Sequence, residues 1–277
     1  MNDLDTGRPN LARVHNYSLG GKDNYGADRA AWEQITEVAP QLGNLHRSNR
    51  FWSARAVRYV AQCTGVDQFL DLGAGLPDAM NTHDFAQEWG RHDVHVVYVD
   101  SDPVCVAHGH AILERNERVH YIAGDLTEPE QIWETSDARI YLDLHRPICL
   151  IMTGVLHHIS DDDGPGVIAA RYAQLLPAGS YVAITHYIDP GPFDPEKHRL
   201  ARDTEQVFLD SGLGSGWFRT RAQILDLFGG LELVPPGLVA LDDWWPEGPS
   251  RQLAAAEHLM VGGLAYKARA GMPPRAV

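Results

Sequence analysis

Short apolar runs alternate with amphipathic stretches through the middle of this chain, and that alternation constrains the fold more than any other feature. Several of the runs end at Gly or Asp, as strands buried in a sheet commonly do. The spacing predicts five strands, at residues 66–72, 94–99, 119–122, 147–152 and 181–185. It predicts helices between them, at residues 78–89, 103–113 and 166–176. Strands that alternate with helices favour a parallel sheet covered by helices on both faces.

The segment before this core is expected to be helical. Residues 11–65 carry apolar side chains at three- and four-residue spacing, most regularly at 27–38 and 49–63. Such spacing is typical of helices that pack by one face. No strand-like run interrupts the segment. We therefore expect an N-terminal helical cap or lid at residues 1–65 over a main domain at residues 66–277.

The alternation breaks after the fifth predicted strand. Gly and Pro residues surround one helical stretch at 195–210, which predicts a substrate-side insertion at about 187–219. A further helix is expected at 220–228. The strand-like runs at 231–234 and 258–268 have no helix between them. They therefore favour an antiparallel edge on an otherwise parallel sheet.

A glycine-rich loop follows the first predicted strand, in the run Phe69-Leu70-Asp71-Leu72-Gly73-Ala74-Gly75-Leu76-Pro77. Glycines allow a tight turn and a close approach of the backbone to a ligand at the carboxyl edge of the sheet. Asp100 ends the second strand, where a carboxylate can accept hydrogen bonds from ribose hydroxyls. Asp125 follows Gly124 after the third strand, where an adenine edge would lie. Acidic residues at three successive strand ends predict a nucleoside site.

The sequence of the loop favours one nucleoside over another. A dinucleotide fingerprint has a third glycine, in the pattern Gly-x-Gly-x-x-Gly. Here Gly75 is followed by Leu76, Pro77 and Asp78, so that glycine is missing and a negative charge lies where a pyrophosphate would sit. S-adenosylmethionine (SAM) has no phosphate and carries a cationic sulfonium, which suits an acidic pocket. The loop alone admits NAD as readily, so an NAD-dependent oxidoreductase remains an alternative.

The order of these motifs resembles that of class I SAM-dependent methyltransferases. More narrowly, nearly the whole chain resembles the actinobacterial S-adenosyl methyltransferase family. The resemblance rests on residues 12–29, the loop at 71–77, and the segments 97–103 and 155–159. It implies a Rossmann-like α/β fold with a seven-stranded, mostly parallel sheet whose last strand is antiparallel. It also implies SAM as the cofactor and S-adenosylhomocysteine as the product.

The same resemblance assigns roles along the predicted crevice. It places Asp71, Gly73 and Gly75 against the methionine part of SAM, Asp100 against the ribose and Asp125 against the adenine. Residues beside these positions are expected to contact the cofactor as well, namely Ser101, Gly124, Leu126 and Thr153.

The N-terminal segment Leu19–Tyr25 has two interpretations. It combines two glycines with Lys, Asn and Tyr between helical flanks, and it lacks the spacing of a phosphate-binding loop. One interpretation is a helix–turn–helix joint in which Gly21 caps the first helix. The other is a lid over the cofactor, with Tyr17, Lys22 and Asn24 reaching its methionine end. The sequence leaves both open.

Methyl transfer from a sulfonium needs an aligned nucleophile in a water-poor pocket, so positioning can supply most of the catalysis. If a base is used, the candidates are His157, His158 and His186, which follow predicted strands and titrate near neutrality. Packing and helix capping are the alternative roles for His157 and His158. Six rings are expected to line a pocket for a small-molecule acceptor: Tyr187, Phe193, Trp217, Phe218, Trp244 and Trp245.

Composition limits the partners and the compartment. The formal net charge is −14 and no cluster of Lys and Arg appears, so we expect no nucleic-acid partner. No apolar stretch approaches the roughly 18 residues of a membrane span, and the N-terminus lacks a signal-peptide pattern. The three cysteines form no C-x-x-C pair and are expected to be buried thiols. We therefore expect a cytoplasmic protein without a membrane partner.

Two further expectations complete the sequence-based picture. No metal site is expected, because His108 and His110 point apart on a predicted helix and the run 161–163 is typical of a solvated loop. A SAM-binding sensor or regulatory protein that transfers nothing is the alternative to an enzyme. The oligomeric state is left open.

Overall fold

An eight-stranded sheet organises the residues that this computed structural model describes, which are 5–89, 93–246 and 252–269. The parallel strands are β1 (Gln68–Leu72), β2 (His95–Asp100), β3 (Val119–Ala123), β4 (Cys149–Thr153) and β5 (Tyr181–Tyr187). The antiparallel strands are β6 (Glu232–Leu233), β7 (Val239–Ala240) and β8 (Met260–Tyr266). The strand order is β3-β2-β1-β4-β5-β8-β6, and β7 pairs beside β8.

This topology confirms the predicted fold class. The path of seven strands, with β8 antiparallel to β5, is the arrangement expected of a Rossmann-like sheet. The structure adds β7, a two-residue strand between the two predicted terminal strands. Because it is so short, β7 gives no apolar run that a sequence pattern could detect.

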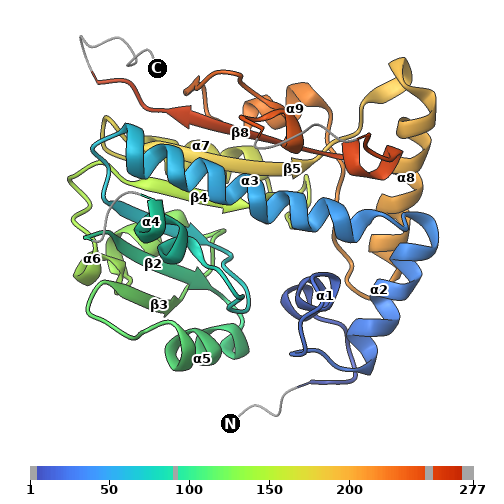
Figure 1. Cartoon of the computed structure of the whole chain (residues 1–277), viewed down its shortest axis with the longest axis horizontal. Helices are drawn as coiled ribbons and strands as arrows, with labels where there is room; N and C mark the ends of the chain where they lie inside the picture. The colour runs from blue at the N-terminus through green and yellow to red at the C-terminus, as the bar shows by residue number, and fades with distance from the viewer. Residues whose placement is uncertain (1–4, 90–92, 247–251, 270–277) are drawn as a thin grey trace.

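The helices surround this sheet (Figure 1). Their bounds are α1 (Leu11–Ser18), α2 (Gly26–Val38), α3 (Leu42–Cys63), α4 (Thr82–Trp89), α5 (Pro103–Ile112), α6 (Ala138–Tyr141), α7 (Pro165–Leu175), α8 (Pro195–Asp210) and α9 (Arg221–Asp226). The helix predicted from residue 78 begins later, at Thr82. Residues 78–81 form a turn instead, in which Asn81 accepts from the Asp78 backbone N–H at 3.0 Å.

Alternate residues of the central strands pack into different cores. Phe69 of β1 joins the core that includes Trp52 of α3. Leu70 and Leu72 of the same strand join the other core, which includes Ile168 of α7. Successive side chains of a strand point to opposite faces, so this division shows that β1 is covered on both sides. Burial on both faces explains why the strand sequence is continuously apolar.

The N-terminal cap is held together by a buried ion pair. Arg13 of α1 donates from Nε to Oδ2 of Asp28 on α2 at 2.9 Å, and both side chains are buried. Asp28 also accepts from the backbone N–H groups of Asn10 and Tyr25, at 2.9 and 2.8 Å. Because Arg13 and Asp28 are paired and hydrogen-bonded in the interior, they hold α1 and α2 in a fixed relative orientation.

The cap lies at one end of the sheet. In Figure 1, α1, α2 and α8 gather beyond the carboxyl ends of the parallel strands, while α3 runs along one face. His46 of α3 contacts Tyr187, the last residue of β5, through a 2.7 Å hydrogen bond. Trp52 lies in the sheet core, so α3 belongs to the cap and to the sheet layer at once. A division into domains at residue 65 stays a prediction.

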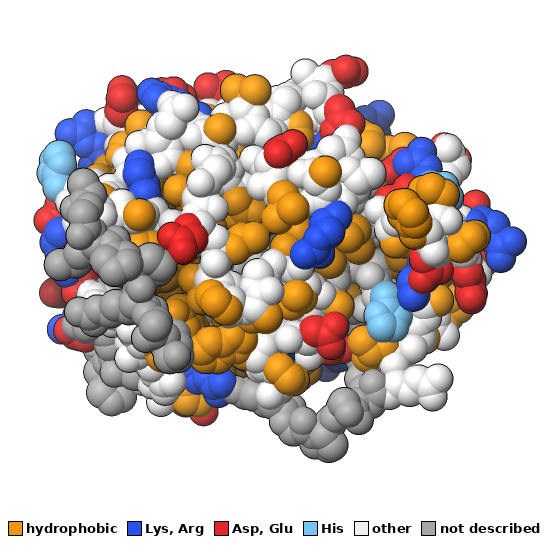
Figure 2. Space-filling model, turned by 90° about the horizontal axis from the view of Figure 1, so that it is seen from above, with side chains coloured by type: hydrophobic (Ala, Val, Ile, Leu, Met, Phe, Trp, Pro, Cys, Tyr) orange, Lys and Arg blue, Asp and Glu red, His pale blue; other side chains and the backbone are white. Residues whose placement is uncertain are grey.

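The described surface has mixed polarity. On the face in Figure 2, charged side chains of both signs surround hydrophobic ones. Among the described ranges, no helix is both long and apolar enough to cross a bilayer. Cys105 and Cys149 are buried as expected, but the same expectation is wrong for Cys63, which is exposed. Cys63 is the last residue of α3, where the helix leaves the core.

Candidate functional site

The glycine-rich loop requires glycine for two physical reasons. Gly73 and Gly75 have φ values of 65° and 69°, which L side chains rarely adopt. A Cβ at Gly73 would also lie 2.5 Å from Cγ1 of Val155, in the loop after β4. The backbone N–H groups of Gly73 and Ala74 donate to the Val99 carbonyl at 2.8 and 3.1 Å. The loop is therefore fixed against β2 and closely packed against the end of β4.

Asp100 sits at the end of β2, beside this loop. Its Oδ2 accepts from the Gly75 backbone N–H at 2.8 Å, and its Oδ1 accepts from the Asp102 backbone N–H at 2.9 Å. Each carboxylate oxygen has two lone pairs, so one remains on each for a ligand hydroxyl. Burial raises the pKa of Asp100 above its ordinary value, although the backbone hydrogen bonds oppose that shift.

Asp71 faces a small hollow at the end of β1. Its Oδ2 accepts from the Thr82 hydroxyl at 2.6 Å. Burial raises the pKa of Asp71 from 3.8 to about 6, against the lowering effects of that hydrogen bond and of Arg50. The hollow is lined by Arg50, Asp71, Ala74, Gly75, Pro77, Asn81, Thr82, Tyr98, Leu113 and Tyr121. A poorly solvated carboxylate next to an arginine suits a ligand with one cationic and one anionic group.

Arg50 and Tyr121 are residues of this hollow that the sequence reasoning missed. Arg50 lies on α3 and pairs with Asp78 at 3.5 Å. Tyr121 of β3 donates from its hydroxyl to the Gly75 carbonyl at 2.7 Å, so it helps to hold the glycine-rich loop in place. No spacing in the sequence links Arg50 to the loop. Tyr121 does face the same side of its strand as Val119, a pattern that alternation can reveal.

The loop after β3 joins the same edge of the sheet. The Gly124 backbone N–H donates to the Asp100 carbonyl at 3.0 Å. Leu126 Cδ2 lies 3.4 Å from the place of a Cβ on Gly73. Asp125 is exposed, and its Oδ1 accepts from the backbone and hydroxyl of Thr127 at 2.8 and 2.7 Å. Its Oδ2 has no such bond in the described ranges.

Other predicted cofactor residues take different positions. Ser101 is exposed immediately after Asp100, and Thr153 ends β4 opposite Thr185 of β5. The structure therefore brings together the loops after β1, β2, β3 and β4. Their roles toward SAM stay predictions.

Helix α1 lies against the glycine-rich loop. Ala12 Cβ is 4.0 Å from the place of a Cβ on Gly75. Asn10, the N-cap of α1, donates from Nδ2 to Asp102 Oδ2 at 2.8 Å. Tyr17 is partly buried against the core, whereas Lys22 is exposed. Thus α1 itself, more than the turn after it, covers the loop.

In the turn after α1, the expected helix cap falls on a different glycine, and the expected contacts of Tyr17, Lys22 and Asn24 with the cofactor stay predictions. Gly20, with φ 88°, adopts the left-handed conformation that was expected of Gly21. A Cβ on Gly21 would lie 2.3 Å from Asn16 Nδ2, so close packing explains that second glycine. Asn24 donates from Nδ2 to the Gly21 carbonyl at 3.0 Å and to Asn16 Oδ1 at 3.3 Å. The side chain of Asn24 therefore closes the turn.

Five histidines gather next to this edge, from α1, α3, the turn after β4 and β5: His15, His46, His157, His158 and His186. The rings of His157 and His158 lie 4.4 Å apart, and those of His157 and His186 lie 5.5 Å apart. Burial lowers the pKa of every one of the five below 6.5. The cluster is therefore made of neutral imidazoles at pH 7.

Hydrogen bonds fix the tautomer of His186. Its Nε2 faces Nη1 of Arg219 at 2.8 Å. Because a guanidinium can only donate, Nε2 accepts and Nδ1 carries the proton, which it donates to the Tyr187 carbonyl at 2.7 Å. Both nitrogens of His186 are thus engaged. His158 uses Nδ1 toward the Ser215 hydroxyl at 2.9 Å.

Arg219 fixes the turn that carries His157 and His158, and the sequence reasoning did not find it. Its Nη1 donates to the Leu156 carbonyl at 3.1 Å and its Nη2 to the Ile159 carbonyl at 2.7 Å. Its Nε and Nη2 also donate to Oδ1 of Asp161, at 3.0 and 2.8 Å. With His186, these contacts use all five guanidinium N–H groups. A lone arginine before α9 gives no sequence signal for such a role.

The aromatic residues expected to line an acceptor pocket behave differently from that expectation. Tyr187 and Phe218 stack at 4.7 Å inside the core, and Trp244 is fully buried. Phe193 is 99% exposed, in the turn before α8. Trp217 and Trp245 are half-buried. Most of the six rings therefore belong to the core or the surface, because the insertion packs back on β5 through backbone hydrogen bonds of Arg219.

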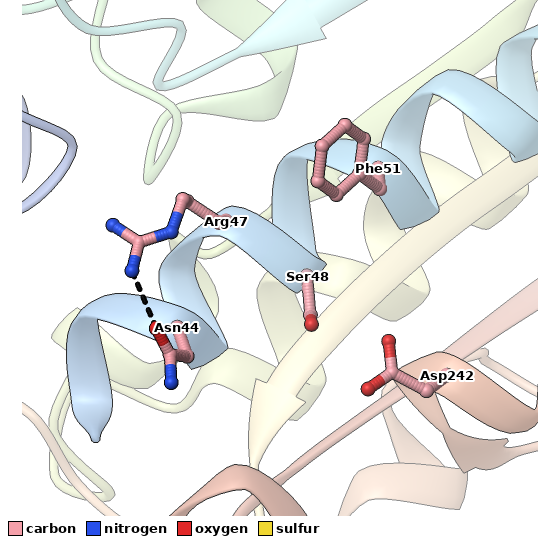
Figure 3. A pocket seen from close by; sticks show the side chains of 5 residues that line it. All are labelled: Asn44, Arg47, Ser48, Phe51 and Asp242. Carbon is pink, nitrogen blue, oxygen red and sulfur yellow. Dashed lines mark hydrogen bonds between the residues drawn. The ribbon is translucent and has the colours of Figure 1, made fainter. Parts of the chain in front are cut away.

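A larger hollow of about 410 Å³ lies elsewhere, between α3 and the turn η4 (Leu241–Asp243). Its lining residues are Asn44, Arg47, Ser48, Phe51 and Asp242. In Figure 3, Ser48 and Asp242 point toward each other across it, whereas Arg47 and Phe51 lie on the outer side of α3. None of these residues belongs to the loops after β1, β2, β3 and β4. We therefore take the edge formed by those loops, and not this hollow, as the candidate functional site.

The chain is similar over nearly its whole length to known proteins. A family model described as S-adenosyl methyltransferase matches residues 1–268. A crystal structure from Thermobifida fusca, described as that of a candidate methyltransferase, has a TM-score of 0.88 at 37% identity and covers 97% of this chain and 98% of that one. A DUF574 family protein from Streptomyces avermitilis has a TM-score of 0.85 at 34% identity, with 95% and 99% covered. No curated protein matches the chain.

Proposed function

Because this chain belongs to the S-adenosyl methyltransferase family, we propose that it transfers the methyl group of SAM to an oxygen or nitrogen atom of a small molecule. SAM is the cofactor, and the NAD alternative is set aside by the family. The observation that supports a small acceptor is the histidine cluster, whose members on α1, α3, the turn after β4 and β5 are all buried or half-buried. A macromolecular substrate would need an open surface at this point.

The cofactor end of the proposed site is the hollow around Asp71. The carboxylate of Asp71 would face the ammonium group of the methionine part, and the guanidinium of Arg50 would face its carboxylate. Asp100 would accept from the ribose hydroxyls through the lone pairs that its backbone hydrogen bonds leave free. Asp125, exposed at the end of β3, would lie near the adenine.

The acceptor end would work mainly by positioning. The cofactor supplies a methyl group that is already activated, so the protein must align a nucleophile and exclude water. The histidines are neutral, so each has a nitrogen lone pair that can accept a proton, but the burial that lowers their pKa values also makes them weaker bases. Of the three candidate bases, His186 has both nitrogens engaged and His158 has one, so His157 is the favoured base. Arg219 acts as a positioning residue for the turn that holds His157.

A binding measurement tests the cofactor end. We expect Asp100→Asn to weaken SAM binding, measured by isothermal titration calorimetry, by roughly tenfold or more, because a charge-assisted acceptor is lost. The matched control is Asp203→Asn, an exposed carboxylate on α8, which should leave the affinity unchanged. Equal affinities for wild type and Asp100→Asn would show that the proposed site is misplaced.

A transfer measurement tests the reaction. The wild-type protein is incubated with methyl-labelled SAM and a small-molecule extract of Streptomyces avermitilis, the source of one of its structural relatives. Label in a low-mass product supports the proposal. Tight SAM binding without transfer to any fraction would instead favour a sensor, and label only in protein or nucleic acid would contradict a small acceptor.

A further inference from the structure

Several buried side-chain atoms of the described residues have no hydrogen-bond partner, and two of them belong to residues near the turn after β4, Asn49 and His157. Asn49 of α3 is 4% exposed and His157 is 2% exposed. Asn49 Oδ1 and His157 Nδ1 are completely shielded and unpaired. Buried polar groups are normally paired, because leaving one unsatisfied costs about 1–3 kcal/mol. A protein that retains two such groups close together needs a reason for them.

Both side chains approach Gly154, in the turn after β4. A Cβ at Gly154 would lie 3.1 Å from Asn49 Nδ2 and 4.0 Å from His157 Cε1, the ring carbon bonded to the unpaired Nδ1. Gly154 has φ 76°, so glycine is also required there by the backbone. Any larger residue at this position would therefore press on the side chain of Asn49.

This point adjoins the cofactor end of the site. Arg50, the next residue after Asn49 on α3, lines the hollow at Asp71. Val155, the next residue after Gly154, packs against Gly73 of the glycine-rich loop. The two unpaired groups thus belong to a part of the structure that borders the glycine-rich loop and its hollow.

The charged groups on the β5 side of the cluster are already paired. Arg219 uses all five N–H groups, two of them on Asp161. Glu205 is buried, accepts from the Phe218 backbone N–H and pairs with Arg202. The histidines are held neutral by burial. Arg219 is the charged residue that affects the pKa of His157, whereas Arg47 and Arg50 of α3 act on His46 and His15. Within the described ranges, the contacts of Arg219 therefore leave neither a free cation nor a free carboxylate beside His157.

We propose that Asn49 and His157 recognise the methyl acceptor, and that this acceptor is an uncharged molecule with a hydroxyl or a heteroaromatic N–H. The inference rests on the proposed function and adds the substrate class. A lone pair of the acceptor forms the bond to the methyl carbon, and the S–CH₃ bond breaks with its electron pair left on sulfur. The acceptor proton passes to a ring nitrogen of His157, and Asn49 holds the reacting group in line.

The first test uses stability as well as activity. Asn49→Leu removes an unpaired amide from the ligand-free protein, so we expect its thermal midpoint to rise by roughly 2–4 °C. Methyl transfer into the extract should fall at least tenfold, with SAM affinity within twofold of wild type. The matched control is Gln68→Met on β1. Gln68 is equally buried but paired with the backbone of Asp143, so its loss should lower the midpoint.

Three results would overturn the assignment of Asn49. A fall in the midpoint of Asn49→Leu would show that the amide has a structural partner. Transfer equal to that of wild type would show that the amide does not contact the acceptor. A loss of SAM affinity of tenfold or more would assign Asn49 to the cofactor. His157→Gln, which keeps a neutral hydrogen-bonding group, should bind SAM normally and retain more transfer than His157→Leu.

The second test concerns the charge of the acceptor. The extract is divided at pH 7 into anionic, cationic and neutral fractions by ion exchange, and each is incubated with methyl-labelled SAM. Label confined to the neutral fraction supports the inference. Label confined to a charged fraction overturns it while leaving the proposed methyltransferase function intact. No label in any fraction, with SAM binding intact, counts against the proposed function itself.

Discussion

Replacing Asp71 by Asn should stabilise the ligand-free protein while weakening its hold on SAM. Burial raises the pKa of Asp71 from 3.8 to about 6. Above pH 6, this pKa difference lowers the free energy of unfolding of the wild-type protein by about 3 kcal/mol, because folding must desolvate the ionised carboxylate. Asn is close in shape and can still accept from the Thr82 hydroxyl. The variant should therefore gain up to about 3 kcal/mol at pH 7.5.

The stability gained by the substitution Asp71→Asn depends on pH. A carboxyl whose folded pKa is raised contributes its stability at low pH, and that stability is lost as the pH rises through about 6. The advantage of Asp71→Asn over wild type should therefore fall to about 1 kcal/mol at pH 4.5 and vanish near pH 3. Comparing the two proteins at each pH cancels the titration of the histidines. Urea denaturation between pH 4.5 and 7.5 measures the difference.

The same carboxylate predicts how SAM affinity depends on pH. If ionised Asp71 faces a cationic group, wild-type affinity should rise about tenfold from pH 5 to pH 7, as the ionised fraction increases. Asp71→Asn should bind more weakly and lose this dependence in calorimetric titrations. The reasoning is refuted if Asp71→Asn is less stable than wild type at pH 7.5, or if its advantage does not change with pH.

Three further predictions concern the loop and the histidine cluster. Gly73→Ala should cost about 1–3 kcal/mol in urea denaturation, because of its φ of 65° and the 2.5 Å approach to Val155; an unchanged midpoint would contradict this. Arg219→Met should cost about 2–4 kcal/mol by leaving carbonyls and a ring nitrogen unpaired, and a cost below 1 kcal/mol would refute its role. Burial lowers the pKa of His158 from 6.5 to about 3, so stability should be lost as the pH falls below 6.5. His158→Gln should lose less over that range, and equal acid sensitivity would argue against burial as the cause.

Local sequence determined the main elements of the fold. The runs around Phe69 and Val97 are continuously apolar because both faces of their strands are covered, and such runs can be recognised without knowledge of their neighbours. Gly73, Gly75 and Asp100 could also be predicted, since a turn at a strand end and a carboxylate at the next strand are local patterns. The start of α4 could not be predicted, because side-chain hydrogen bonds in the preceding turn decide it.

The acceptor end of the site depended on tertiary structure. Asn49, Gly154 and Arg219 come from a helix, a strand end and a loop, and no sequence spacing relates them. Whether a buried group is paired depends on atoms brought close by folding, so Asn49 looks in sequence like an ordinary residue of α3. The histidines were visible in the sequence, but their hydrogen bonds and lowered pKa values were not. The sequence by itself determined where the cofactor loop lies, because backbone conformation is local. Only the tertiary structure decided what faces it, because desolvation and hydrogen-bond satisfaction arise between distant segments.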